Sequence, residues 1–172
     1  IPNVDDNFPF DKNAYQKDSD EDGMGYVCDL CPDTANYLGA DCPYEDTTIY
    51  EIMRDEKPLG SFVKVQGIVT AKNGKAFYFQ VDPDDHDPVF FEKFSGTYVY
   101  VTTSSTMTDP ALGDKVEVSG RVGDYYGNTQ IEFVADITII TAGKGVPSPV
   151  TVLPAEIKTG GELADDYKSV LV

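Results

Sequence analysis

Acidic side chains at alternate positions near the N-terminus are the residues best suited to chemistry. The segment "DSDEDGMGYVCD" places them at loop positions 1, 3, 5 and 12, with a glycine at 6: Asp18, Asp20, Asp22, Asp29 and Gly23. This spacing fits the calcium-loop template D-x-D-x-D-G-x5-(E/D). Calcium takes about six to eight oxygen ligands, and alternate acids in a tight loop converge on one centre. The segment therefore predicts a calcium site, against the alternative of an acidic loop that is only solvated.

Backbone groups complete the predicted site. Gly23 permits the sharp turn that leaves the Met24 carbonyl facing the ion. Tyr26, at position 9, has no carboxylate, so a water molecule or a backbone oxygen is expected to serve there.

An internal repeat extends the pattern toward the N-terminus. The segment "DDNFPFDKNAY" (5–15) aligns with "CDLCPDTANYL" (28–38) at an offset of 23 residues. In this register Asn3 and Asp6 take positions 9 and 12 of an earlier loop, whose first six positions would precede Ile1. Repeats of this kind stack on their neighbours and need several copies for stability. We therefore expect the chain to begin inside a calcium-binding array of a longer protein.

Residues 1–42 resemble thrombospondin type 3 repeats, which occur in animal matrix proteins and in many bacterial surface and secreted proteins. The segments "DSDEDGMGYVCDLCP" and "NAYQKD" carry the resemblance. It implies a string of calcium loops with little regular secondary structure. The ligands that it implies are Asp18, Asp20, Asp22, Asp29 and the Met24 carbonyl. Two positions depart from the family: Tyr26 replaces an acid, and Phe8 replaces a cysteine.

The cysteine count is odd, since the chain holds Cys28, Cys31 and Cys42, and one thiol is left over. The C-x-x-C spacing suggests zinc only weakly, because a fourth ligand is lacking and the single histidine, His86, is distant in sequence. In the resembled family the C-P cysteine bonds forward and the D-x-x-C cysteine bonds back, to the position that Phe8 occupies. The resemblance thus implies Cys31–Cys42, with Cys28–Cys42 as the alternative. A disulfide implies an oxidising, extracellular compartment.

The chain is strongly acidic, with 30 acidic and 13 basic residues and a net charge of -17. Residues 1–60 carry -11 of this charge and residues 61–172 carry -6. Neither part has the basic footprint of a protein that binds phosphate backbones. A solubilising acidic surface accounts for much of the second part, whereas the spacing in the first part favours divalent cations.

β-Strands are predicted for the second part of the chain, because hydrophobic residues recur at every second position from Ser61 onward. Asn73-Gly74 is a two-residue hairpin signal, and Gly67 and Gly120 lie inside strands where a barrel bends. The predicted strands cover residues 61–71, 75–82, 96–103, 114–126 and 128–142. Amphipathic helices of ten residues are missing, and no run of about 18 apolar residues suggests a membrane span.

These strands predict a mostly β fold class: a five-stranded OB-type Greek-key barrel, preceded by an irregular calcium-binding repeat segment. The predicted domains are 1–45 with the calcium-binding repeats, 46–145 with the barrel, and 146–172 as a Pro-rich linker or tail. The barrel also resembles the OB-fold domains of bacterial extracellular nucleases, in the segments "SFVKVQGIVTA", "KAFYFQ" and "LGDKVEVSGRVGDYYGNTQI". In those proteins such a domain often precedes a metal-dependent nuclease domain.

The chain itself is predicted not to be an enzyme. His86, its one histidine, lies in the loop "DPDDHDP", and neither a nucleophile–histidine pattern nor a Gly-rich phosphate loop is present. The acids of residues 82–87 fit no cation-loop template, so a solvated surface is expected there.

One face of the barrel is a candidate ligand-binding surface. Strand alternation puts four residues on the outer face, and two more lie in a nearby loop: Tyr78, Gln80, Tyr98, Tyr100, Tyr125 and Tyr126. OB faces bind oligonucleotides and oligosaccharides, by stacking among other contacts. Residues 61–143 hold 11 acids and 6 bases, which disfavours single-stranded nucleic acid against a sugar or protein ligand. The alternative is that tyrosines occupy strands only because of their β propensity.

The sequence therefore predicts a non-catalytic, calcium-binding and calcium-stabilised module of a secreted or cell-surface protein, with a barrel that docks a ligand or a neighbouring domain. One alternative is a structural subunit of an extracellular assembly or adhesive layer. Another is the nucleic-acid-binding accessory domain of a secreted nuclease.

Overall fold

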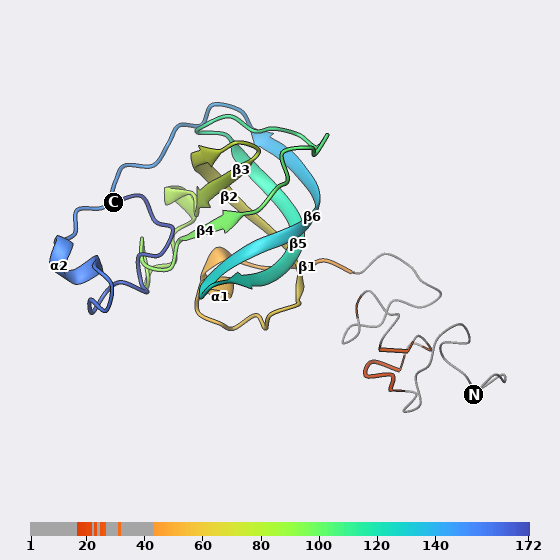
Figure 1. Cartoon of the computed structure of the whole chain (residues 1–172). Helices are drawn as coiled ribbons and strands as arrows, with labels where there is room; N and C mark the ends of the chain where they lie inside the picture. The colour runs from red at the N-terminus through yellow and green to blue at the C-terminus, as the bar shows by residue number, and fades with distance from the viewer. Residues whose placement is uncertain (1–16, 22, 24, 27–30, 32–42) are drawn as a thin grey trace. The chain divides into compact units, whose positions relative to one another are not determined.

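Six strands form one sheet in the computed structural model, which describes residues 17–21, 23, 25–26, 31 and 43–172. The chain divides into two compact units, residues 1–44 and 45–172, and the sheet lies in the second. Its elements are β1 (Glu45–Asp46), α1 (Ile49–Met53), β2 (Phe62–Asn73), β3 (Ala76–Gln80), the 3-10 helix η2 (Pro83–Asp85), β4 (Gly96–Val99), β5 (Lys115–Tyr125), β6 (Asn128–Thr141) and α2 (Pro154–Ile157) (Figure 1). The mostly β class predicted from the sequence is confirmed.

The sheet closes on itself through β2. The strand order is β1-β2-β3-β4-β6-β5, and β2 pairs with β5 as well as with β3. Its first half, Phe62 to Ile68, pairs with β5, and its second half, from Ile68 onward, pairs with β3. β4 and β6 run parallel, whereas the neighbouring pairs of long strands are antiparallel. This order, with the parallel pairing of β4 and β6, supports an OB-fold.

The core lies inside the closed sheet and under α1. Phe77 and Phe79 are fully buried, as the alternation along β3 predicts, and their rings meet edge to face. Helix α1 contributes Ile49 and Ile52, both without exposed surface. Thr48 begins this short helix with a capping box, in which its side chain and that of Glu51 satisfy each other's backbone N–H groups.

Several details differ from the sequence-based prediction. Gly74 and Lys75 form the β2–β3 turn, rather than Asn73-Gly74, because Asn73 already pairs with Ala76. β4 ends at Val99, four residues before the predicted end, and β1 was not predicted.

β6 contains a bulge that the sequence did not predict. Ser119 of β5 pairs with Asp136, whereas Arg121 pairs with Glu132, so three residues of β6 oppose one of β5. A bulge of this kind bends the strand and redirects its side chains.

The last residues fold back onto the sheet. We call residues 163–171 the C-terminal strap; Figure 1 shows this segment returning to the region beside β4. The Phe94 N–H donates to the Asp166 carbonyl at 2.6 Å, and the Val150 N–H donates to the Leu171 carbonyl at 2.9 Å. Residues 146–172 therefore belong to the same unit as the sheet.

Within the described part of the chain, no helix combines the length and apolar character needed to cross a bilayer.

Candidate ligand-binding face

Three tyrosines share an outward surface of β3 and β4, which we call the tyrosine face: Tyr78, Tyr98 and Tyr100. Tyr78 and Tyr98 are cross-strand neighbours, and their ring centroids lie 4.7 Å apart with an interplanar angle of 49°. Tyr100 follows two residues later on the same side and is 49% exposed. The structure thus brings these three predicted residues together.

Tyr98 is uncharged at neutral pH. Burial raises the pKa of Tyr98 above its usual value, and a hydrogen bond with the Asn73 side chain only partly opposes this effect. The phenol of Tyr98 therefore stays protonated and can donate a hydrogen bond.

Gln80 lies on the same side of β3 but is not exposed, contrary to the sequence-based expectation. It is only 3% exposed, and its Oε1 accepts a hydrogen bond from the Leu171 N–H at 2.8 Å. Its Nε2 donates to Ser95 Oγ at 3.4 Å. The alternation predicted the correct side of the strand, but it could not predict that the strap covers this position.

Tyr125 and Tyr126 lie instead at the tip of the β5–β6 hairpin. They are 64% and 93% exposed, and their rings meet edge to face at 4.7 Å. Tyr126 and Gly127 both have positive φ, as a tight turn between antiparallel strands requires. The hairpin tip is thus a separate aromatic pair, joined to the strap through Lys168, whose Nζ donates to the Gly127 carbonyl at 3.4 Å.

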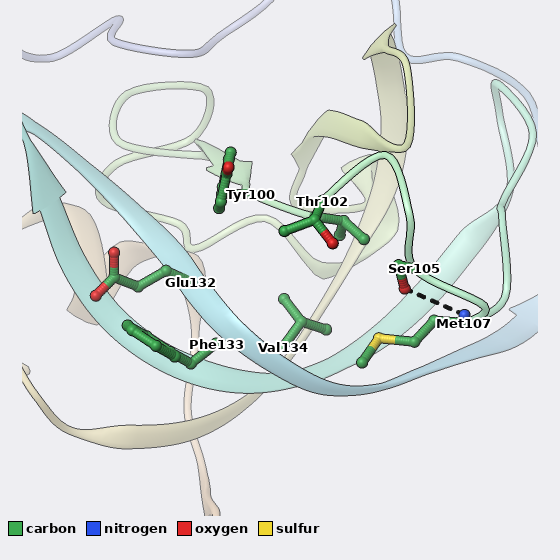
Figure 2. A pocket seen from close by; sticks show the side chains of 8 residues that line it. Tyr100, Thr102, Ser105, Met107, Glu132, Phe133 and Val134 are labelled. Carbon is green, nitrogen blue, oxygen red and sulfur yellow. Dashed lines mark hydrogen bonds between the residues drawn. The ribbon is translucent and has the colours of Figure 1, made fainter.

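A pocket of about 250 Å³ adjoins the tyrosine face at Tyr100. Its lining comes from the loop after β4 and from the β6 bulge: Tyr100, Val101, Thr102, Ser105, Met107, Glu132, Phe133 and Val134. Figure 2 shows Tyr100 and Thr102 on one side and Phe133 with Val134 on the other. The Met107 N–H donates to Ser105 Oγ at 3.2 Å, which holds the loop beside the pocket.

The β6 bulge directs Phe133 outward. Phe133 has φ +46° and is 69% exposed, and a left-handed backbone is uncommon and costly for a bulky residue. The Arg121 guanidinium lies 4.2 Å from the Phe133 ring centroid and also pairs with Glu132 at 2.8 Å. The pocket is therefore mostly apolar, and its one acidic group is neutralised. Strand alternation did not predict Phe133 and Met107, because neither a bulge nor a loop follows it.

The acidic loop after β3 is not simply solvated, contrary to expectation. Asp82 is 2% exposed and pairs with Lys144 and with Lys115, the latter at 3.0 Å. Lys144 also reaches Asp84 at 3.0 Å, and Lys115 reaches Asp85 at 2.7 Å. These two lysines offset two of the four negative charges of the loop and tie it to the start of β5 and to the segment after β6.

Positive charge in the sheet unit is mostly committed to ion pairs. Nine of the eleven basic residues in 45–172 pair with acids: Arg54, Lys57, Lys72, Lys75, Lys93, Lys115, Arg121, Lys144 and Lys168. The same unit holds 20 acidic residues. Little free positive charge remains to attract a polyanion.

Two of the predicted calcium ligands, Asp18 and Asp20, lie among the described residues. The others lie outside them: Asn3, Asp6, Asp22, Met24 and Asp29. The Asp18 carboxylate accepts backbone N–H groups of Glu21 at 2.9 Å and of Gly23 at 3.0 Å. Each carboxylate oxygen keeps further acceptor capacity, so Asp18 fits a role as a cation ligand.

The described part of this loop is tightly turned. Gly23 has φ +93°, and the Tyr26 N–H donates to the Lys17 carbonyl at 2.7 Å. Among the residues that the structure describes, no group of three or more His, Cys, Asp or Glu side chains is placed to hold a metal ion. The calcium site stays a prediction.

Cys31 is buried and disulfide-bonded. Cys42, its predicted partner, lies outside the described residues, so the Cys31–Cys42 pairing stays a prediction.

Comparisons with known proteins add structural neighbours of low similarity. No protein-family model matches the sequence, and no curated protein matches it. The hypothetical protein ygiW from E. coli has a TM-score of 0.40 and 16% identity, over 56% of this chain and 90% of that one. The telomere capping protein Ten1 from S. pombe has a TM-score of 0.42 and 14% identity, over 56% and 81%. OBody AM1L10, solved bound to hen egg-white lysozyme, has a TM-score of 0.40 and 20% identity, over 58% and 94%. TM-scores and sequence identities this low carry no argument about the fold. The OB-fold assignment therefore rests on the strand order of this chain.

Proposed function

We propose that the chain is a non-catalytic, calcium-stabilised module of a secreted or surface protein, and that its OB-type barrel binds a neutral oligosaccharide on the tyrosine face. The observation that carries the proposal is the grouping of Tyr78, Tyr98 and Tyr100 beside the pocket. Aromatic rings stack against the apolar C–H faces of sugar rings, and tyrosine hydroxyls bond to sugar hydroxyls.

The pocket supports a ligand made of ring-sized units. Its volume of about 250 Å³ is below the ~300–1,000 Å³ of sites that enclose a drug-sized ligand. It therefore suits one ring, while further rings lie on the open tyrosine face. Thr102 supplies a hydroxyl at the rim, and Phe133 supplies a second aromatic surface.

Charge favours a sugar over a nucleic acid. OB faces take both oligonucleotides and oligosaccharides. A nucleic acid needs cations along its backbone, and the sheet unit has committed most of its lysines and arginines to ion pairs. A neutral chain of sugars has no such requirement.

Calcium is proposed to stabilise the N-terminal segment through Asp18, Asp20, Asp22, Asp29 and the Met24 carbonyl, with Asn3 and Asp6 belonging to an earlier loop. The order of the ligands along the sequence and the turned backbone at Gly23 support this role. Extracellular calcium modules bind at about 10⁻⁴–10⁻³ M, which agrees with a secreted location.

The test is calorimetric titration with glucose and N-acetylglucosamine oligomers, from disaccharide to hexasaccharide, and with a thymidine oligonucleotide. We expect sugar binding that is insensitive to salt, and a loss of about tenfold in Tyr98→Ala, the factor that corresponds to about 1.4 kcal/mol. Tyr126→Ala is the matched control, because Tyr126 is 93% exposed and lies at the hairpin tip.

Other outcomes would favour the alternatives. Oligonucleotide binding that weakens steeply with salt, without sugar binding, would favour the accessory domain of a nuclease. Growth of the scattered-light mass with concentration, again without sugar binding, would favour the structural subunit.

A further inference from the structure

The C-terminal strap crosses the same outer surface of the sheet that carries the tyrosine face. Gln80 pairs with Gly96 in the β3–β4 ladder, and the neighbouring pair on the same side is Tyr78 with Tyr98. Side chains two residues apart along a strand point to the same face. Without the strap, the surface would continue from the tyrosines to Gln80 and Gly96.

The strap is closely fitted to this position. The Leu171 N–H donates to Gln80 Oε1 at 2.8 Å, and Val170 is only 8% exposed. A Cβ atom at Gly96 would overlap the carbonyl oxygen of Ser169, so the absence of a side chain there admits the strap. Main-chain and side-chain contacts together therefore hold it over the Gln80–Gly96 pair.

Further contacts fix the strap on both sides of this pair. The Phe94 N–H donates to the Asp166 carbonyl at 2.6 Å, and Lys93 pairs with the Asp166 carboxylate at 2.9 Å. Lys168 reaches the Gly127 carbonyl in the β5–β6 turn. The strap thus extends from β3 to the hairpin that carries the second aromatic pair.

We propose that the C-terminal strap is the end wall of the oligosaccharide-binding face and sets the length of ligand that the face accepts. This inference rests on the proposed function of the tyrosine face. A ligand enters beside the pocket at Tyr100, covers Tyr98 and Tyr78, and meets the strap at Gln80. From Tyr100 to Gly96 the bounded face covers four residues, about 13 Å along the strand, which is the span of about three sugar rings.

Displacing the strap should lengthen the face. The Gln80 side-chain amide would lose its bond to Leu171 and become available to a sugar hydroxyl, and Gly96 would present an unobstructed backbone. The surface would then run on toward Tyr125 at the hairpin.

Val170→Asp tests this inference, because a buried carboxylate would expel the strap without altering the sheet. Val172→Asp is the matched control: it carries the same substitution two residues away, at a position that is 49% exposed. Gly96→Ala is an independent variant, in which a Cβ on the sheet displaces the strap. If Val170→Asp loses its near-ultraviolet circular dichroism, and hence its tertiary structure, Gly96→Ala provides the test instead.

Two readouts are needed: hydrogen exchange of the Leu171 and Phe94 amides, and the affinity for glucose and N-acetylglucosamine oligomers of increasing length. In the unmodified chain and in Val172→Asp, affinity should stop rising at the trisaccharide. In the strap variants the two amides should exchange faster, and the hexasaccharide should bind about tenfold more tightly than the trisaccharide, the factor that corresponds to about 1.4 kcal/mol.

The outcomes separate the two proposals. In one outcome, the strap variants exchange the Leu171 and Phe94 amides faster and yet bind sugars with the same dependence on length as the unmodified chain. That result would overturn the role of the strap and leave the proposed function of the tyrosine face standing. Failure of every form to bind sugar would overturn the proposed function, and the end-wall role with it.

Discussion

Asp82 is a single carboxylate on which two distant segments converge. It is 2% exposed, and Lys115 and Lys144 both bond to it. Burial alone would raise the pKa of Asp82, but these hydrogen bonds outweigh it and hold the pKa below its ordinary value. The resulting stabilisation is complete above the unfolded pKa of about 3.9 and is lost as the pH falls through the lower folded pKa.

We expect Asp82→Asn to lower the free energy of unfolding by about 2 kcal/mol near neutral pH, because two lysines lose their buried partner. Asp84→Asn is the matched control, since Asp84 binds the same Lys144 but its side chain is 82% exposed. Its effect should be well under about 1 kcal/mol. Urea unfolding from neutral to acidic pH would check both values. A deficit in Asp82→Asn that does not shrink in acid would contradict the assigned role.

Strand β2 closes the sheet by changing partners near Gly67. A Cβ at Gly67 would lie 2.6 Å from Phe79 Cδ2 and 2.8 Å from the Gln80 carbonyl oxygen. We expect Gly67→Ala to lower the free energy of unfolding by about 1–3 kcal/mol through overpacking. Gly74→Ala, in the β2–β3 turn, is the comparison, because the nearest atom to its Cβ is 3.8 Å away and only its positive φ is unfavourable. A smaller effect at Gly67 than at Gly74 in urea unfolding would refute this account of closure.

The β6 bulge supports a surface more than it supports the fold. Phe133→Gly should change the free energy of unfolding by less than about 1 kcal/mol, because opposing effects nearly cancel. Glycine relieves the strain of the left-handed backbone, but it loses more conformational entropy on folding and gives up the contact with Arg121. The fully buried Phe77, changed to Ala, should cost about 3–5 kcal/mol. Phe133→Gly should also weaken sugar binding by about tenfold if the pocket holds a ring. Stability would be measured by urea unfolding and binding by calorimetry.

Local alternation made most of the sheet predictable from the sequence. A period of two fixes which side chains face the core, so the burial of Phe77 and the outward direction of Tyr98 follow from it. The burial of Gln80 depends on Leu171, which is distant in sequence and belongs to no periodic element. The bulge lies in "EFVAD" (132–136), which contains neither a glycine nor a proline that would indicate an irregularity in the strand. Hence three tyrosines of the candidate site were predictable, whereas Phe133 and the strap were not.

The whole chain combines an acidic segment with a sheet unit, and calcium dependence should belong to the first. We expect chelation to lower the melting temperature, and Asp20→Ala with Asp22→Ala to abolish the rise that calcium produces, because the loop then loses two carboxylates. Asp84→Asn, with its exposed carboxylate in the sheet unit, should retain the calcium-dependent rise. Differential scanning calorimetry with and without chelator would measure this. An unchanged melt on chelation would contradict a calcium-stabilised segment.

The strap also has a mechanical consequence. It is held to the sheet by scattered contacts, such as Leu171 N–H to Gln80 and Lys168 to Gly127, whereas β5 and β6 share a continuous ladder. A pulling force applied at the C-terminal end would load these contacts one after another, so the strap should peel away at lower force than the ladder opens. In single-molecule stretching we expect a short early extension before the sheet ruptures. Tension on the chain would then expose Gln80 and Gly96, so the surface open to a ligand would depend on load.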